Sequence, residues 1–330
     1  MEKRSGNLKA NFSEIARDLG ISRGTIYRVI NQSPLVAPDT RNRVIEALNR
    51  HGYYTHRRIR RSRILFDFCK HVYLTEMGEF LLKRLPEDEY SCVRTDHRRD
   101  IEGFLNAVAA CDAAVFCSIP DDRLIETVRR TNPEIFTITL TTESSADVTI
   151  TPNNKLGGEL AARHLIAMGQ RDIAVFLSDT HPTRMERYKS FLGEIITLSP
   201  DCRVTPVYHH SGEEFAVTFE KFFRSRSTLP DAVFFPAGGF AQTFWEIFSS
   251  RGAPYDQIGI MSYDRPEDIF DEKTQFQSFD RIEFQRQHIL DWAEYYITNR
   301  PMMKKRSPVH TSVGVTLVTA GSIKKKERQP

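Results

Sequence analysis

The 330-residue chain contains little cysteine and tryptophan, and it has no long hydrophobic run. Because its five cysteines are an odd number, they cannot form a fully paired disulfide framework, and we expect reduced thiols packed inside a cytoplasmic protein. No stretch has the roughly 18 consecutive apolar residues of a membrane-spanning helix, and the N-terminal residues do not form an export signal. The sequence therefore predicts a protein without a membrane partner.

The chain also lacks the motifs of common catalytic and cofactor sites. It has no glycine-rich phosphate loop with lysine, no Cys and His cluster at metal-ligand spacing, and no readable Ser, His and Asp arrangement. The glycine pairs at 157–158 and 238–239 do not fit a dinucleotide fingerprint. His209 and His210 follow a predicted strand, and we expect them at its solvated end rather than on a metal. We therefore expect that the protein is not an enzyme and that it binds no metal and no cofactor.

Positive charge is concentrated at one end of the chain. Residues 1–63 hold 14 Lys and Arg against 5 Asp and Glu, whereas the remainder holds 32 against 38. A basic head on a mildly acidic body attracts phosphates at that end only, and binding that releases counterions weakens steeply with salt. The charge distribution predicts a nucleic-acid partner for the head and none for the body.

Residues 12–31 predict two short amphipathic helices joined by a tight turn. Ala16 is small enough for the helices to cross closely, and Gly20 can adopt the left-handed conformation that ends the first helix. Ser22 can cap the second helix, because its hydroxyl accepts from backbone amides of the first turn. The apolar faces consist of Ile15 and Leu19 in the first helix and of Ile26, Val29 and Ile30 in the second.

This pattern is typical of a helix-turn-helix, in which the start of the second helix enters the major groove of DNA. Arg23 is exposed at that start, and its forked guanidinium suits the two acceptors of a guanine edge. Thr25 and Arg28 are expected to add contacts to the DNA backbone or to further bases. The predicted DNA-contacting residues of this helix are Ser22, Arg23, Gly24, Thr25, Tyr27, Arg28 and Asn31.

A third helix follows, with a proline in its first turn, apolar Val44, Ile45 and Leu48 at helical spacing, and a stop at Gly52. The segments EIARDLGIS, TIYRVIN, VAPDTRNRVIEAL and GYY resemble, in order, the LacI/GalR family of bacterial repressors. Two residues depart from the family. Tyr27 stands where a serine is usual, and Ala37 replaces the serine that usually caps the third helix.

The resemblance implies a hinge between headpiece and body that forms in the DNA minor groove. Here residues 57–63 read RRIRRSR, shorter than in relatives and without the leucine that wedges between base pairs. Ile59 is the one apolar residue available as a wedge, and Arg57, Arg58, Arg60 and Arg61 flank it with phosphate-binding charge. The alternative is a solvated basic linker, as most charge runs are. The sequence leaves both open.

From Ile64 onward, apolar runs of strand length alternate with longer amphipathic stretches, which is typical of parallel sheets covered by crossover helices on both faces. The runs are ILFDFC, AAVFCSI, EIFTITL, DIAVFL, AVFFPA and QIGIMSY. A break at TPNN, residues 151–154, divides them into two sets. We therefore predict two doubly wound α/β subdomains with a ligand cleft at the carboxyl ends of their strands.

The family resemblance extends through this body and covers about 80% of the chain, as VTITPNNKLGGELAARHLIAMGQRDIAVFL, QIGIMSYDRPEDIF and VTLVTAGS illustrate. Residues 69–100 match poorly, and their helix, expected at 74–85, could be trimmed. The resemblance implies a periplasmic-binding-protein-like body with linking strands near 151, 281 and 310. The predicted divisions are a headpiece at 1–56, a hinge at 57–63, and a body at 64–330. Within the body, one subdomain spans 64–150 and 281–310, and the other spans 151–280 and part of 311–322.

Two polar residues match effector-binding positions of relatives: Arg187 at the start of a helix and Asp264 at a strand end. The alternative for this pair is a structural ion pair between loops. Ala237 and Gly238 replace an Asn-Asp pair of the family, which argues against a sugar effector. Phe240, Trp245 and Tyr263 could stack on a ligand, but the spacing of Phe240, Phe244 and Phe248 favours core packing. The expected effector-site residues are Arg187, Asp264, Ala237, Gly238 and Phe240.

Two hypotheses follow. In the first, the chain is a homodimeric transcription regulator, expected to be a repressor, which reads a pseudo-palindromic operator in double-stranded DNA and responds to a small-molecule effector, such as a carbohydrate, in the cleft. In the second, the body has lost small-molecule sensing and serves as a dimerisation or protein-docking module. A solute-binding transport protein would share the body fold, but the headpiece and the missing export signal argue against it.

Overall fold

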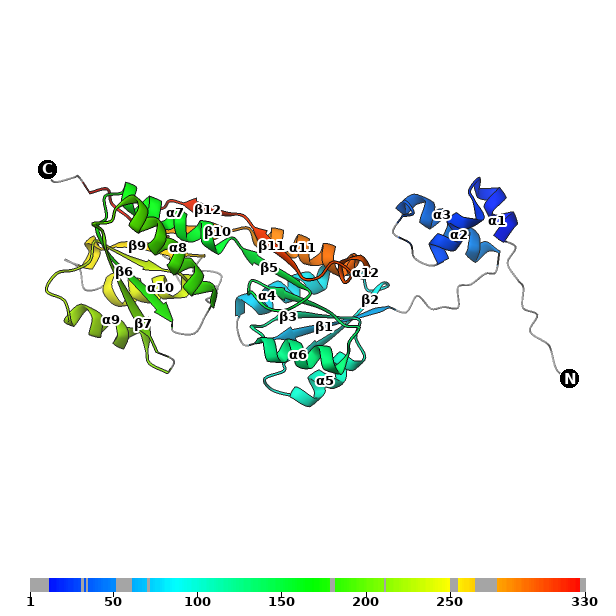
Figure 1. Cartoon of the computed structure of the whole chain (residues 1–330), viewed down its shortest axis with the longest axis horizontal. Coiled ribbons are helices and arrows are strands. Elements are labelled where there is room, and N and C mark those ends of the chain that lie inside the picture. Colours follow the sequence, from blue (N-terminus) through cyan, green and yellow to red (C-terminus); the bar gives the residue numbers. More distant parts are fainter. Residues whose placement is uncertain are drawn as a thin grey trace. The chain divides into compact units, whose positions relative to one another are not determined.

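The computed structural model divides the chain into two compact units, Met1–Ser62 with Pro86–Ser91 and Arg63–Leu85 with Cys92–Pro330. The residues that the structure describes are 12–30, 33, 35–51, 61–69, 72–178, 182–210, 212–249, 255–264 and 278–326. The N-terminal part consists of helices, and helices cover the sheets in the rest (Figure 1).

The headpiece consists of helices α1 (Phe12–Leu19), α2 (Arg23–Ile30) and α3 (Pro38–Arg50). Their apolar faces meet in one small core, as the helical spacing predicts. Its fully or nearly fully buried members are Ile15, Ala16, Ile26, Val29, Val36, Val44, Ala47 and Leu48. The predicted three-helix headpiece is therefore confirmed over the described residues.

The turn between α1 and α2 has the predicted geometry. Gly20 has a φ of +64°, in the left-handed region, and the Ile21 amide donates to the Ala16 carbonyl at 2.9 Å. The Ser22 hydroxyl accepts from the Thr25 amide at 3.1 Å and so caps α2. α3 begins with Pro38, a residue suited to the first helical position because it has no amide hydrogen to satisfy.

The body holds two six-stranded sheets (Figure 1). In the first, the order is β11-β5-β4-β3-β1-β2; in the second, it is β12-β10-β9-β8-β6-β7. The first sheet comprises β1 (Ser62–Phe68), β2 (Tyr90–Thr95), β3 (Ala113–Cys117), β4 (Phe136–Leu140), β5 (Val148–Pro152) and β11 (Val309–Val313). The second comprises β6 (Asp172–Ser178), β7 (Arg203–His209), β8 (Ala232–Phe235), β9 (Gly259–Tyr263), β10 (Asp280–Phe284) and β12 (Val315–Val318). The predicted doubly wound α/β body is confirmed, and β12, which pairs antiparallel with β10, departs from the otherwise parallel pattern.

Helices cover both faces of the first sheet. On one face, Phe104 and Val108 of α5 (Ile101–Ala109) and Ile125 of α6 (Asp122–Thr131) pack against Leu65 and Phe116. On the other, α4 (Val72–Arg84) lies so close to β1 and β3 that a Cβ on Gly78 would stand 2.5 Å from the Cys117 sulfur. α4 is the helix that we expected at 74–85. All five cysteines are free thiols, as predicted.

The second sheet is covered by α7 (Asn154–Ala167) and α8 (Pro182–Leu198) on one face and by α9 (Phe215–Arg224) and α10 (Gly238–Phe248) on the other. The α9 and α10 face is rich in phenylalanine, with Phe219, Phe223, Phe244 and Phe248 packed on Phe235 and its neighbours. Phe244 and Phe248 are therefore core residues, as their spacing predicted, and Phe240 is only partly buried. A short 3-10 turn, Tyr255–Gln257, precedes β9.

The chain passes from the first sheet to the second between β5 and α7, where the TPNN break lies. We expected residues 281–310 to belong to the first subdomain. The strand at the start of this segment, β10, instead pairs with β9 in the second sheet, whereas α11 (Arg286–Thr298) packs against α4 and β5. The return crossing therefore lies after Phe284. The short α12 (Arg300–Met303) follows α11, and no helix in the described ranges is long and apolar enough to cross a bilayer.

Two helical glycines provide a matched stability test. α7 and α8 cross so closely that a Cβ on Gly158 would stand 2.3 Å from the Arg187 carbonyl oxygen and 2.9 Å from the Phe191 nitrogen, whereas a Cβ on Gly193 meets nothing within 4 Å. Gly158→Ala should therefore lower the free energy of unfolding by about 1–3 kcal/mol through overpacking. Gly193→Ala should raise it by about 0.5–1 kcal/mol through helix propensity. Urea unfolding followed by circular dichroism measures both; equal effects would show that the helices do not cross at Gly158.

Candidate functional sites

The second helix of the headpiece presents its polar side to solvent. Ile26 and Val29 face the core, whereas Arg23, Tyr27 and Arg28 are exposed. Ser22 and Gly24 are exposed too, and Thr25 is half-buried. The side chain of Tyr27 is 45% exposed, and its ring packs edge-on against Phe12. Of the residues chosen as DNA contacts in this helix, Arg23, Gly24, Tyr27 and Arg28 are therefore accessible on the side away from the core.

Some predicted contacts lie outside the described residues. These are Asn31, Arg57, Arg58, Ile59 and Arg60, so the choice between wedge and linker remains a prediction. Arg61 is described and exposed.

Arg187 is the centre of a buried polar network in the second subdomain. Arg187 is only 6% exposed. Its Nε donates to Asn154 Oδ1 at 2.9 Å, and its Nη1 donates to the Pro236 carbonyl at 2.8 Å and lies 3.5 Å from Asp264 Oδ2. The guanidinium also stacks on the Tyr263 ring, 3.4 Å from the ring centre. One side chain thus joins α7, α8 and the carboxyl ends of β8 and β9.

Asp264 follows β9 directly and has a φ of +69°, a left-handed conformation that is uncommon for aspartate. Its amide donates to the Ile282 carbonyl at 2.8 Å, which fixes the backbone. Burial raises the pKa of the Asp264 carboxyl, and the Arg187 guanidinium offsets this rise only in part. The carboxyl is therefore held where its charge is incompletely compensated.

Four buried polar atoms around Arg187 have no hydrogen-bond partner among the described residues. They are Tyr263 Oη, Asp264 Oδ1, Thr183 Oγ1 and Tyr73 Oη. Thr183 lies one helical turn before Arg187 on α8, and Tyr73 comes from α4 of the first subdomain. Burial raises the pKa of Tyr73. The Tyr73 ring packs edge-on against Phe284 of β10, with 6.2 Å between ring centres, so the two subdomains are in contact here. Sequence reasoning missed Tyr73 and Thr183.

The other predicted effector residues lie next to this network. Ala237 follows the Pro236 carbonyl that Arg187 binds, and Gly238 begins α10. Phe240 lies under the Arg184 guanidinium, 4.9 Å from it, and contacts Phe215. Trp245 is partly buried in the phenylalanine core. Tyr263 is fully buried, as a core residue would be, yet its ring also faces Arg187.

His209 is buried, whereas we expected it at the solvated end of a strand. His209 is the last residue of β7, but it is 8% exposed rather than solvated. Its ring stacks on Phe215 at 3.8 Å between ring centres, and its Nδ1 is 3.0 Å from Thr218 Oγ1. The strand end is buried because α9 folds back over it. His210 is exposed as expected, and no group of metal-binding side chains occurs in the described part of the chain.

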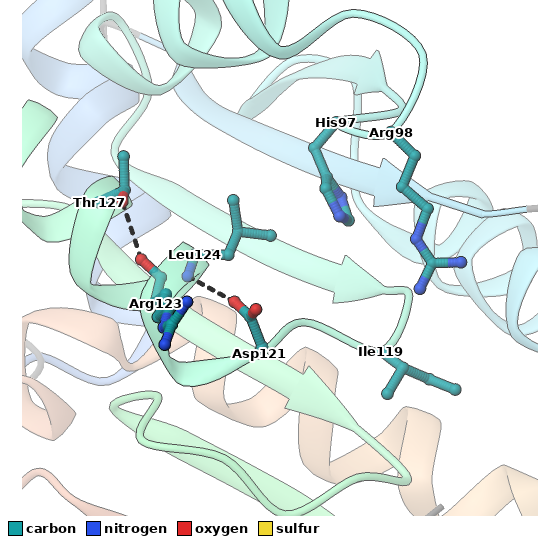
Figure 2. A pocket seen from close by; sticks show the side chains of 7 residues that line it. All are labelled: His97, Arg98, Ile119, Asp121, Arg123, Leu124 and Thr127. Carbon is teal, nitrogen blue, oxygen red and sulfur yellow. Dashed lines mark hydrogen bonds between the residues drawn. The ribbon is translucent and has the colours of Figure 1, made fainter. Parts of the chain in front are cut away.

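A shallow cavity of about 390 Å³ opens at the carboxyl end of β3 in the first subdomain (Figure 2). His97 and Arg98 lie on one side of it, and Asp121, Arg123 and Leu124 lie on the other, at the start of α6. Thr127 and Ile119 complete the lining.

Behind this cavity, buried Asp67 brings together a histidine and a serine. Asp67 Oδ2 accepts from Ser118 Oγ at 2.6 Å and lies 2.7 Å from His97 Nδ1. In a nucleophilic triad the histidine stands between serine and aspartate, so that it can take the serine proton. Here the aspartate stands between them. The arrangement therefore ties the end of β1 to the residues that follow β2 and β3, without activating Ser118.

The two units define a class of protein: a DNA-binding headpiece of three helices attached to a two-sheet α/β body. Residues 11–56 match the sequence model of "Bacterial regulatory proteins, lacI family". The headpiece is accordingly a DNA-binding domain of the LacI family. That family consists of non-enzymatic transcription factors, in agreement with the expectation from the motifs. No protein in a search of curated sequences matches the chain.

Solved structures of LacI-family proteins share the fold. The lac repressor dimer bound to operator and the anti-inducer ONPF is 16% identical, with a TM-score of 0.62 over 95% of this chain and 99% of that one. The transcriptional regulator CelR–cellobiose complex is 17% identical, with a TM-score of 0.61 over 94% and 98%. The Cra dual regulator from Pseudomonas putida with fructose 1-phosphate is 14% identical, with a TM-score of 0.62 over 78% and 98%.

Replacing Arg187 tests whether it holds this network together. Arg187→Met keeps an unbranched stem but removes the donors to Asn154 and Pro236 and the partner of Asp264. We expect the free energy of unfolding to fall by about 3–5 kcal/mol, because buried polar groups lose their partner. Arg203→Met, which alters a long 3.7 Å surface ion pair with Asp172, should cost less than about 1 kcal/mol. Urea unfolding compares the two; similar costs would contradict the central place of Arg187.

Proposed function

We propose that this regulator binds a polar small molecule between its two subdomains and that this effector sets its affinity for operator DNA. The observation that carries the proposal is the group of four unpartnered buried polar atoms around Arg187. Buried polar groups in folded proteins are nearly always satisfied, and each exception calls for a missing partner. Tyr73 contributes from one subdomain, and Thr183, Tyr263 and Asp264 contribute from the other.

The chemistry of these atoms suits a ligand with several hydroxyl or charged groups. Three hydroxyls can donate or accept, and Asp264 Oδ1 can accept. A ligand that joins Tyr73 to the other three holds the subdomains in one arrangement, and it thereby favours one state of the whole body. Cellobiose and fructose 1-phosphate in the similar CelR and Cra structures support a carbohydrate or a related metabolite as the class of effector.

A homodimer that represses transcription by occupying a pseudo-palindromic operator is the form of regulation that we propose. The dimeric lac repressor bound to operator supports this assembly. Two headpieces would read two half-sites, because dimer symmetry is mirrored in operator symmetry. The exposed face of α2 would enter the major groove at each half-site.

A second candidate is a body that serves only as a dimerisation or protein-docking module. The protein contacts of Arg187 favour this second candidate. Its guanidinium already binds Asn154, the Pro236 carbonyl and Asp264 without any ligand. The two candidates differ in what the unpartnered hydroxyls do. In a docking module they have no ligand to bind, and removing them has no regulatory effect.

Arg23→Ala tests the assignment of the recognition helix. We expect discrimination at one operator position to fall by about 1–3 kcal/mol, because a bidentate arginine distinguishes guanine from the other bases. Arg50→Ala removes the same charge from exposed Arg50 at the end of α3 and should leave base preference unchanged. Selection of binding sites from random DNA, followed by affinity measurements on single-base variants, gives the readout. A uniform loss across all sequences in Arg23→Ala would make Arg23 a phosphate contact.

Thr183→Val tests the effector site. The hydroxyl of Thr183 is buried without a partner, so its removal should leave the ligand-free protein equally stable or about 1 kcal/mol more stable. In the matched control Thr218→Val, the lost hydroxyl donates to Glu213 at 2.9 Å, and the free energy of unfolding should fall by about 1–2 kcal/mol.

The same variants are then screened against sugars, sugar phosphates and nucleosides, with operator affinity as the readout. Effector control requires that a compound change the operator affinity of the wild type and of Thr218→Val but not that of Thr183→Val. If no compound alters operator affinity in any variant, the docking-module candidate replaces the effector proposal. Equal destabilisation by both substitutions would show that Thr183 has a partner in the protein.

A further inference from the structure

The two sheets of the body carry a residue of the same unusual conformation at equivalent positions. β4 lies third from the β11 edge of the first sheet, and β9 lies third from the β12 edge of the second. Thr141 directly follows β4 with a φ of +66°, and Asp264 directly follows β9 with a φ of +69°. In the part of the chain that the structure describes, no other residue except glycine has a positive φ.

The backbone hydrogen bonds of the two residues correspond as well. The Thr141 amide donates to the Ile150 carbonyl of the neighbouring β5 at 2.7 Å, just as the Asp264 amide donates to the Ile282 carbonyl of the neighbouring β10 at 2.8 Å. Thr141 is therefore the counterpart, in the first subdomain, of the aspartate in the candidate effector site.

Both residues lie at the sheet edges where the chain crosses between the subdomains. Each crossing leaves a strand at its carboxyl end: β5 leads into α7, β10 leads into α11, and β11 leads through Gly314 into β12. Because β4 runs parallel to β5 and β9 runs parallel to β10, the residues that follow β4 and β9 lie at these same edges. Ligands of α/β proteins bind at the carboxyl ends of parallel strands.

A buried hydroxyl next to Thr141 lacks a partner. Thr142 is 3% exposed, and its Oγ1 has no hydrogen-bond partner among the described residues. The hydroxyl of Thr139 is satisfied, because it donates to the Thr142 carbonyl at 3.1 Å and lies 2.9 Å from Ser144 Oγ. Since buried polar groups are nearly always satisfied, the Thr142 hydroxyl calls for a partner from outside the chain.

The conformation of Thr141 points in the same direction. A left-handed backbone is strained for a β-branched residue, and glycine or asparagine would adopt it at lower cost. Strained residues of this kind persist mainly where a ligand or a mechanism depends on them. The half-buried Thr141 and the buried Thr142 thus combine strain with an unsatisfied hydroxyl.

We propose that Thr141 and Thr142 bind the effector from the first subdomain, and that they contact an uncharged, hydroxyl-bearing part of it, as in a neutral carbohydrate. The inference rests on the proposed effector site and adds a binding surface on the side opposite Asp264. A threonine hydroxyl can both donate and accept, which suits a hydroxyl group of the ligand. The adjacent charged residue, Glu143, is exposed and acidic, and it disfavours a phosphate at this position.

The test compares full-length wild type with Thr141→Gly and Thr142→Val. Thr137→Val is the matched control, because Thr137 lies on β4 and is fully buried, but its hydroxyl donates to Asp147 Oδ2 at 2.8 Å. Thermal unfolding is measured without ligand and with glucose, ribose, cellobiose or glucose 6-phosphate.

Without ligand, Thr142→Val should melt no lower than wild type, because the hydroxyl that it removes has no partner. Thr141→Gly should also melt no lower, because the relief of left-handed strain offsets the entropy of glycine in the unfolded chain. Thr137→Val should melt about 2–4 °C lower, because it leaves Asp147 without a partner.

With ligand, we expect a neutral sugar to raise the melting temperature of wild type and Thr137→Val by about 2–4 °C at tenfold excess over the wild-type Kd. The shift should fall to less than half in Thr142→Val and Thr141→Gly, because a lost hydrogen bond weakens binding about five- to tenfold.

A sugar that stabilises both variants as much as wild type would overturn the assignment of Thr141 and Thr142. If the same sugar has no effect on Thr183→Val, the effector site itself remains. Stabilisation of wild type by glucose 6-phosphate alone, or by none of the four compounds, would overturn the neutral class, whereas the wider screen with Thr183→Val decides whether any effector acts. Equal destabilisation by Thr142→Val and Thr137→Val would show that the Thr142 hydroxyl has a partner in the protein, which also contradicts the proposal.

Discussion

The buried guanidinium of Arg187 joins the elements on which the rest of the candidate site depends. It connects α7 through Asn154, β8 through the Pro236 carbonyl and β9 through Asp264. Without it, the carboxyl ends of two neighbouring strands and the start of two helices have no common partner. Because these contacts also fix Tyr263 and Asp264, they hold polar atoms in place that nothing in the described protein satisfies. The satisfied contacts of Arg187 and the buried polar atoms without hydrogen-bond partners thus lie next to each other.

Under the proposed function, this combination lets a stable α/β body respond to a small molecule. The framework residues make their hydrogen bonds within the second subdomain, whereas Tyr73 comes from the first. A ligand that completes the network must engage both subdomains and so shifts the balance between their arrangements. The unpartnered polar atoms lower the stability of the unliganded protein, and they gain hydrogen bonds when the ligand binds. Such a competition between function and stability is common in proteins.

The sequence predicted the elements better than the contacts between them. Strands buried on both faces are continuous apolar runs, and the headpiece follows from the spacing of Ile15, Gly20 and Ser22, so both could be recognised locally. The sheet to which β10 belongs could not be recognised locally, because its pairing with β9 depends on the tertiary fold. His209 was misjudged because α9 covers the strand end. Thr183 carried one usable signal, its place in the first helical turn after a buried strand. Tyr73 joins the site only through subdomain packing.

The central claim is that the site around Arg187 keeps a buried carboxylate with one unsatisfied oxygen. The pKa of the Asp264 carboxyl measures this most directly, through a pH titration of full-length protein with carboxyl-labelled aspartate followed by nuclear magnetic resonance, with Asp264→Asn assigning the signal. We predict a pKa above the ordinary aspartate value of about 3.9, because burial outweighs the charge of Arg187. A pKa at or below that value would mean that the carboxylate is already fully satisfied, which would contradict the claim.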